Sequence, residues 1–358
     1  MTKYTRTGLT AIAVLLGVAW VVAQQAPAQQ DPGGAQPGAG GQGAGQARGG
    51  GQGPGPAAAP DRNPQTKKVV LAWADTRNGQ AQKDYFTHAL AQLERYGYES
   101  GAYDLHIRTD SNVISFNPKK TDGTPASGGP SLNNVDAIVF AGHRNVPLDE
   151  AGQQDLITAI RDQGVGFVSL YIGILPWDTF PEMANILGAK AAAVNVHDPF
   201  GSGGSTIINE SPDFPAARHL PAIWSLPHDQ PYHPELYDRD EIQVLLRKDV
   251  SKFAPVANYT RTDGDYPVAW AKMYGQGRVF FSSLGHSPVL GARAWDDNNL
   301  LRMYYEAIKW SLGLTPYELK PHPLPADARP PQGPPAPAQA APAGGGRQGA
   351  SAGVPPAR

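Results

Sequence analysis

The chain has 358 residues, and 30 lysine and arginine residues against 32 aspartate and glutamate residues give it a formal net charge of −2. This balance, without long blocks of like charge, argues against a nucleic-acid partner. The chain has no cysteine, which excludes disulfides, thiolate metal ligands and cysteine nucleophiles.

The N-terminus has the composition of an export signal. Lys3 and Arg6 precede an uncharged apolar run over residues 9–23 that ends near small residues such as Ala23. The run is shorter than the ~20 apolar residues of a membrane-spanning helix. We therefore interpret residues 1–23 as a cleaved signal peptide, which predicts a periplasmic or secreted protein with no stable membrane span after cleavage. The alternative is an uncleaved N-terminal anchor.

Two low-complexity segments flank the central part of the chain. Residues 24–66 are rich in Gly, Gln, Pro and Ala, and residues 321–358 in Pro, Ala and Gly. Neither contains the spaced large apolar side chains that offset the entropy cost of ordering, so we predict a disordered linker and a disordered tail. Residues 67–320 remain, a length that suits one α/β domain.

The first half of this domain alternates strand and helix patterns. Apolar runs that end in polar or glycine-containing loops predict strands over residues 68–73, 103–107, 135–141 and 165–171. Apolar side chains at helical spacing predict helices over residues 83–96 and 149–163. Because strands and helices alternate, we expect an α/β fold with a doubly wound, mostly parallel sheet.

The second half is less regular. A strand is predicted over residues 241–247, and the runs 267–274 and 277–283 flank Gly275-Gln276-Gly277, which predicts an antiparallel C-terminal hairpin. The last helix is predicted over residues 298–312, where Gly313 follows and ends it.

Ligands of open parallel sheets bind outside the carboxyl ends of the strands. Polar and aromatic residues follow the predicted strands at Asp75, His143, Tyr171, Trp177 and His286, and the loop 227–233 adds Asp229 and Tyr232. We expect the tips of these strands to meet in one crevice. Acid/base groups are then Asp75, His143, Asp229 and His286. The rings of Tyr171, Trp177 and Tyr232 are predicted to bind substrate, since such rings stack on sugar faces and bond hydroxyls.

Each carboxylate also has a purely structural interpretation. Asp75 lies in a turn-like stretch, where aspartate commonly bonds to nearby backbone, and Asp229 could bind backbone N–H groups of a long loop. The histidine spacings match no zinc signature, so we predict neither a metal nor a cofactor. The alternative is a divalent metal, since His and Asp side chains are expected to converge in the crevice, but no spacing requires one. The chain also lacks a G-x-S-x-G motif and a Walker loop.

The C-terminal motifs resemble a known family. Pro267-Val268-Ala269-Trp270, then Gly275-Gln276-Gly277-Arg278-Val279-Phe280 and Leu284-Gly285-His286, are similar to a ThuA-like (trehalose utilisation) pattern of P-x-x-W, G-x-G-R-V-F and L-G-H. The similarity extends over roughly residues 67–315. It implies a flavodoxin-like, class I glutamine amidotransferase-like fold and a role in carbohydrate metabolism, with a small-molecule sugar as partner. Without cysteine, the chain cannot hydrolyse glutamine as amidotransferases do.

The chain departs from the family pattern near the expected site. Tyr171 stands where members commonly carry His, and Gln230 stands in a motif that often reads Asp-Glu-x-Tyr. Our first hypothesis is an exported protein that processes a disaccharide or keto-sugar by acid/base chemistry. The second is a catalytically silent carbohydrate-binding protein, because tyrosine does not titrate near neutrality as histidine does. In a third hypothesis, the low-complexity tails carry the main function of the protein, and the domain serves as an adhesion or assembly module.

Overall fold

The computed structural model describes residues 67–75, 77, 84–142, 148–174, 179–191, 204–252, 263–287 and 289–326. The predicted signal peptide and linker lie outside these residues, as does most of the predicted tail. His143 and Trp177 lie outside them as well.

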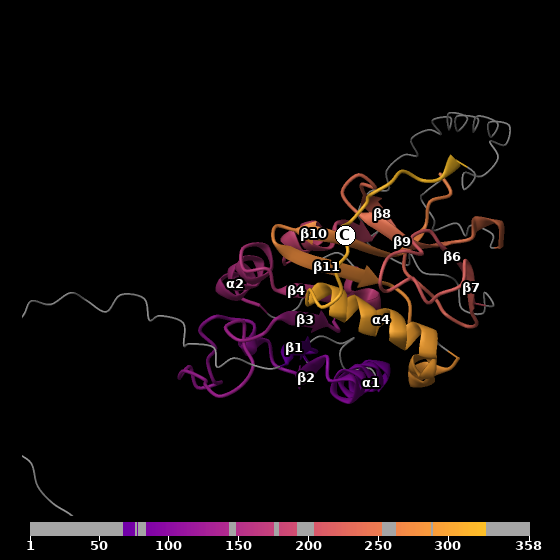
Figure 1. Cartoon of the computed structure of the whole chain (residues 1–358). Helices are drawn as coiled ribbons and strands as arrows, with labels where there is room; N and C mark the ends of the chain where they lie inside the picture. Colours follow the sequence, from indigo (N-terminus) through magenta and orange to yellow (C-terminus); the bar gives the residue numbers. More distant parts are fainter. Residues whose placement is uncertain are drawn as a thin grey trace, which may run out of the picture. The chain divides into compact units, whose positions relative to one another are not determined.

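One large sheet forms the centre of the domain (Figure 1), with nine strands in the order β2-β1-β3-β4-β11-β10-β9-β6-β7. Its first five strands are parallel: β2 (Tyr103–Arg108), β1 (Lys68–Trp73), β3 (Ala137–Phe140), β4 (Gly166–Leu170) and β11 (Gly277–Ser282). The following strands pair antiparallel: β10 (Pro267–Tyr274), β9 (Gln243–Lys248), β6 (Ser205–Asn209) and β7 (Ile223–Leu226). The α/β class expected from the sequence is confirmed.

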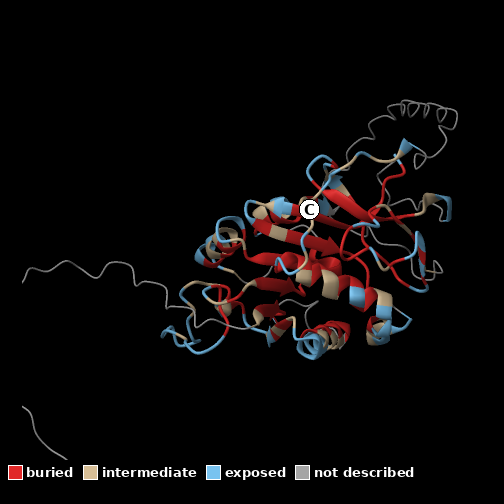
Figure 2. Ribbon diagram, viewed as in Figure 1, coloured by how far each residue is buried: buried red, intermediate tan, exposed pale blue. Residues whose placement is uncertain are grey.

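The central strands are buried on both faces, as Figure 2 shows. Every residue of β1 after Lys68 is buried, and so is every residue of β3 and β4. Continuous apolar strands of this kind need helices on both sides of the sheet. The apolar sequence of β1 is therefore explained by its place between β2 and β3 in the middle of the parallel half.

Helices supply that cover: α1 (Asp84–Ser100), α2 (Glu150–Arg161), α3 (Glu182–Leu187) and α4 (Asn298–Ser311). Phe280 of β11 packs edge-on against Tyr304 of α4, with 6.0 Å between the ring centroids. The next residue, Phe281, packs against Trp270, whose indole N–H donates to the Leu187 carbonyl at the end of α3. Successive strand residues point to opposite faces, so α4 and α3 cover opposite sides of the sheet.

Aspartate caps fix the starts of two helices. The Asp149 side chain accepts a hydrogen bond from the Gly152 N–H at 2.8 Å, and Asp297 accepts one from Leu300 at 2.8 Å. Each cap satisfies a backbone donor that has no partner within the helix. The helices begin at Glu150 and Asn298 for this reason.

Short elements complete the domain. Strands β5 (Ala189–Ala191) and β8 (Pro234–Tyr237) pair antiparallel in a separate two-stranded sheet. The described 3₁₀ helices are η1 (Ser111–Val113), η2 (Tyr171–Ile174), η3 (Val250–Lys252) and η4 (Gly291–Asp296).

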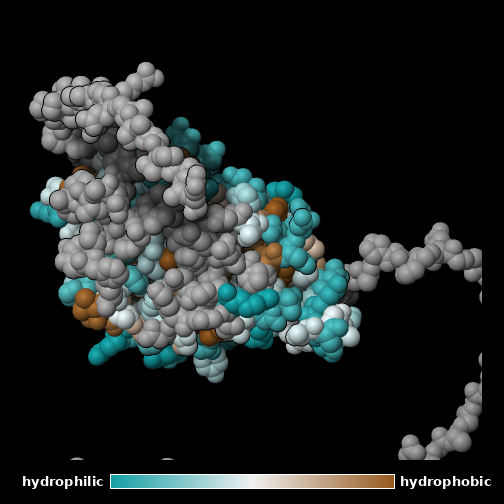
Figure 3. All heavy atoms as spheres, turned by 180° about the vertical axis from the view of Figure 1, so that it is seen from behind, coloured by the Kyte–Doolittle hydropathy of each residue, from teal (hydrophilic) through white to brown (hydrophobic). Residues whose placement is uncertain are grey.

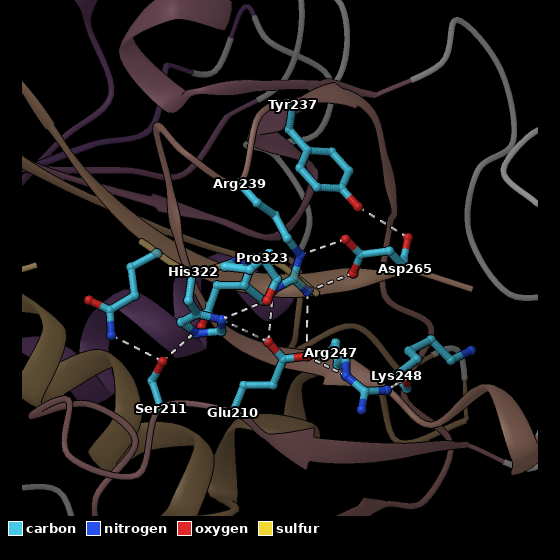
Figure 4. A network of polar contacts seen from close by, with 11 residues as sticks. Glu210, Ser211, Tyr237, Arg239, Arg247, Lys248, Asp265, His322 and Pro323 are labelled. Carbon is cyan, nitrogen blue, oxygen red and sulfur yellow. Dashed lines mark hydrogen bonds and ion pairs between the residues drawn. The ribbon is translucent and has the colours of Figure 1, made fainter. Parts of the chain in front are cut away.

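A buried ion network joins the antiparallel half of the sheet to its loops (Figure 4). The Arg239 guanidinium donates to both carboxylate oxygens of Asp265, at 2.6 and 2.7 Å, and to Glu210 at 2.9 Å. Arg247 of β9 also pairs with Glu210. Burial alone would lower the pKa of Arg239, but the bonds to Asp265 and Glu210 outweigh it and raise the pKa. The guanidinium therefore stays charged inside the protein.

The chain after α4 returns to this network. The indole N–H of Trp310 donates to the Tyr317 carbonyl at 3.3 Å, and His322 Nδ1 lies 4.0 Å from a Glu210 carboxylate oxygen. The described chain thus stays in contact with the domain up to His322, just beyond the predicted boundary at residue 320.

Among the described helices, none combines the length and the apolar composition that a membrane crossing requires. On the side of the molecule seen in Figure 3, the described apolar residues form scattered spots among hydrophilic ones.

Candidate functional site

Neighbouring strands bring four of the predicted site residues together. Strands β4 and β11 are parallel neighbours, with Leu170 opposite Ser282, so their carboxyl ends lie side by side. Tyr171 follows β4 and His286 follows β11, while the loop after β7 adds Asp229 and Tyr232.

The rings at this place form an aromatic cluster of Tyr85, Tyr171, Tyr232 and His286. The imidazole of His286 stacks on Tyr171, with 4.6 Å between centroids and 20° between planes. Tyr232 meets Tyr171 at 5.1 Å, and Tyr85 meets His286 at 5.5 Å, both edge-on. The three tyrosines are buried, whereas His286 is half-buried. His286 is therefore the least buried residue of the cluster.

Tyr171 has an unusual backbone conformation. Its φ is +51°, in the left-handed region that non-glycine residues rarely adopt. Such a conformation costs about 1–3 kcal/mol and persists only where the surrounding structure enforces it, often at functional sites. Burial, and then the neighbouring Tyr232, Tyr85 and Asp229, raise the pKa of Tyr171 well above its usual value. The phenol therefore keeps its proton at neutral pH and can donate a hydrogen bond.

Two hydrogen bonds hold the Asp229 loop against the segment that follows β11. Asp229 Oδ2 accepts the Gly285 N–H at 2.8 Å, and the Gln230 N–H donates to the His286 carbonyl at 2.9 Å. Gly285 has a φ of +109°, and a Cβ there would lie 2.6 Å from the Trp295 ring. Only glycine fits, so the position of His286 depends on it.

Asp75 lies at the end of β1 and is surrounded by hydrogen-bond donors. Its carboxylate accepts the N–H and Oγ–H of Ser111, at 2.9 and 2.6 Å, and the Arg77 guanidinium at 2.7 Å. Burial alone would raise the pKa of Asp75, but the bonds from Arg77 and Ser111 lower it below its usual range. Asp75 therefore stays charged, and no described contact joins it to the aromatic cluster.

Beside Asp75 the surface contains a hollow of about 660 Å³, between the loop 111–123 and the start of α2. Arg77, Lys119 and Lys120 line it together with Asp149 and Asp155. None of the four residues of the aromatic cluster lines this hollow. The hollow is therefore a feature separate from the aromatic cluster.

Within the described ranges, no three His, Asp or Glu side chains converge in a way that could hold a metal ion. The expectations of no metal and no cofactor stay predictions.

The sequence reasoning missed two residues. Tyr85 contacts both Tyr171 and His286, but its position at the start of a helix carries no distinguishing pattern. Ser111, the partner of Asp75, follows the end of β2. The strand-end rule would have found Ser111 if it had been applied to that weaker strand.

Residues 69–311 match the sequence profile of ThuA, which is described as trehalose utilisation. The chain belongs to the ThuA family. No curated protein matches this ThuA family member.

A solved ThuA-like protein has a similar fold. A ThuA-like protein from Bacteroides uniformis aligns with a TM-score of 0.51 and 16% identity, over 68% of this chain and 90% of that one. A ThuA-like protein from Parabacteroides merdae aligns with a TM-score of 0.48 and 12% identity, over 73% of this chain and 95% of that one.

Proposed function

We propose that this ThuA family protein binds a disaccharide or keto-sugar at the aromatic cluster and processes it by acid/base chemistry. One observation carries the proposal: a half-buried imidazole, His286, stacks on the protonated phenol of Tyr171 where β4 and β11 end. Aromatic rings with polar atoms suit sugars, which present apolar faces and hydroxyl edges. The family description supplies the substrate class.

The residues of the cluster have distinct chemical roles in this proposal. His286 transfers the proton, because imidazole is the side chain whose ordinary pKa lies near neutrality. Tyr171 donates a hydrogen bond to a substrate oxygen, and Tyr232 supports it from the side. Asp229 supplies a buried negative charge close to Tyr171 and fixes the backbone before His286.

Three further predicted residues remain part of the proposal. Asp75 would act as a second carboxylate only if Arg77 and Ser111 released it. His143 and Trp177 follow the predicted strands 135–141 and 165–171 in sequence, which is the reason for including them.

The finer fold assignment is also a proposal. The order β2-β1-β3-β4-β11 corresponds to the 2-1-3-4-5 order of flavodoxin-like sheets, and helices cover both faces. This order supports a doubly wound domain related to class I glutamine amidotransferases. The composition of residues 1–23 supports export to the periplasm or the medium.

The function is tested with His286→Ala in the full-length protein. Trehalose, maltose and oxidised trehalose are offered as substrates, and products are followed by chromatography while circular dichroism monitors the fold. We expect product from the wild-type protein and none from His286→Ala. His106→Ala, on the exposed part of β2, is the matched control and should behave like the wild type. Unchanged turnover in His286→Ala would remove His286 from the mechanism.

A second function is favoured by Tyr171 itself. Its raised pKa means that it does not titrate near neutrality, and it stands where family members commonly carry His. A catalytically silent carbohydrate-binding protein would show a higher unfolding temperature with sugar but no product at any enzyme concentration. The same sugar panel therefore separates the two functions.

A further inference from the structure

Two glutamines are equally buried in this protein, and the fold treats them differently. Gln230 and Gln243 each expose 2% of their surface. The Gln243 amide N–H donates to Ser211 at 3.0 Å and Tyr317 at 3.1 Å, and its oxygen accepts the Lys320 N–H at 2.7 Å. In the part of the chain that the structure describes, neither the oxygen nor the nitrogen of the Gln230 amide has a hydrogen-bond partner.

An amide buried without partners destabilises the folded protein. It has lost its hydrogen bonds to water and has gained none from the protein, and an apolar side chain of the same shape would be more favourable. Buried polar groups are nearly always paired in native structures, so each exception needs a reason. Positions that break such a rule are expected to be functional sites.

The backbone of Gln230 lies at the aromatic cluster. Its N–H donates to the carbonyl of His286 at 2.9 Å. On one side in sequence, Asp229 accepts the Gly285 N–H; on the other, Tyr232 packs against Tyr171. Gln230 is therefore fixed between two residues that contact the proposed site.

We propose that the Gln230 amide determines specificity by hydrogen-bonding a hydroxyl group of a neutral sugar. This inference rests on the proposed carbohydrate site. The amide oxygen accepts hydrogen bonds and the amide N–H groups donate them, so one sugar hydroxyl can donate to the oxygen while a second accepts from an N–H. A glutamate at this position could only accept and would add a buried charge. Glutamine thus favours an uncharged polyhydroxy ligand.

The test compares Gln230→Met with Gln243→Met in the full-length protein. Methionine has nearly the shape of glutamine and lacks the amide. Without sugar, Gln230→Met should unfold at the wild-type temperature or roughly 2–4 °C above it, whereas Gln243→Met should unfold at a lower temperature. With trehalose, maltose or oxidised trehalose, whichever stabilises the wild type, Gln230→Met should bind at least about tenfold more weakly. Gln243→Met should keep its affinity below its unfolding temperature.

A second variant, Gln230→Glu, removes the donor and keeps the length of the side chain. Gln230→Glu should also weaken sugar binding. If Gln230 only filled space, both variants would bind sugar like the wild type, because Met and Glu have nearly the size of Gln. The inference is overturned if Gln230→Met loses stability as Gln243→Met does, or if Gln230→Met binds sugar as tightly as the wild type. In both cases a wild-type protein that binds sugar leaves the proposed function standing. If none of the sugars stabilises the wild type, the proposed function fails and the sugar contact fails with it.

Discussion

Asp75 allows the structural and catalytic interpretations of one carboxylate to be separated. In Asp75→Asn, one side-chain oxygen remains and the other becomes an NH₂ group that faces donors. If the remaining oxygen stays on Arg77, the N–H and O–H of Ser111 lose their acceptor, and Ser111 is buried. A buried donor left without a partner costs about 1–3 kcal/mol, so both together cost about 4 kcal/mol.

For a domain of this size, that loss corresponds to a fall in unfolding temperature of roughly 8–16 °C. The measurement is thermal unfolding followed by circular dichroism at pH 7. Asp122→Asn is the matched control, because Asp122 accepts the N–H and Oγ–H of Thr124, at 2.9 and 2.6 Å, on an exposed loop. The control should unfold at the wild-type temperature, since water replaces the lost bonds there.

The pH dependence follows from the lowered pKa of Asp75. A carboxylate whose folded pKa lies below its ordinary value of 3.8 stabilises the protein above that value, and the stabilisation is lost as pH falls through the folded pKa. The difference between wild type and Asp75→Asn should therefore be full at pH 7 and shrink below about pH 4. An unfolding temperature for Asp75→Asn within 2–3 °C of the wild type, equivalent to about 1 kcal/mol or less, would refute the reasoning. Lost sugar turnover at unchanged stability would instead place Asp75 in the chemistry.

Further predictions concern the buried ions and the glycine behind the site. Arg239→Met leaves the buried carboxylate of Asp265 without its partner and should lower the free energy of unfolding, measured with urea, by about 3–5 kcal/mol. Arg161→Met, on the exposed surface, should leave that free energy unchanged. Equal losses in the two variants would contradict the role of burial. Gly285→Ala should lower the unfolding temperature and weaken sugar binding together, because φ is +109° and a ring blocks the Cβ. Gly123→Ala is the control, because its φ is +81° but its Cβ would lie in open space. If Gly123→Ala lowered the unfolding temperature as much as Gly285→Ala, the left-handed φ alone would explain the loss, and the contact with the Trp295 ring would not contribute.

Several strands of the sheet could be predicted because they form short, largely apolar runs. The predicted range 68–73 coincides with β1, and 267–274 coincides with β10. The last helix was predicted from residue 298, where the Asp297 cap fixes its start. Strands β6 and β7 were missed, because strands of four or five residues show too little periodicity to be recognised alone. Strand β6 pairs with β9, more than thirty residues later in the chain, so no local pattern marks it.

The candidate site was predictable where adjacent strands end together. Tyr171 and His286 follow β4 and β11, which are neighbours in the sheet, and the strand-end rule found both. Asp75 follows β1, and β3 lies between β1 and β4. The rule gives the edge of the sheet but not which residues along that edge are in contact, so it does not say whether Asp75 reaches the cluster. The bonds of Asp75 to Ser111 and Arg77 depend on tertiary contacts.

The most direct test is a crystal structure of the full-length protein soaked with the sugar that stabilises it most. The sugar should lie where β4 and β11 end, against His286 and Tyr171, with a hydroxyl within hydrogen-bond distance of the Gln230 amide. A sugar bound only in the hollow beside Lys119 and Asp149, with the aromatic cluster unchanged, would contradict the account.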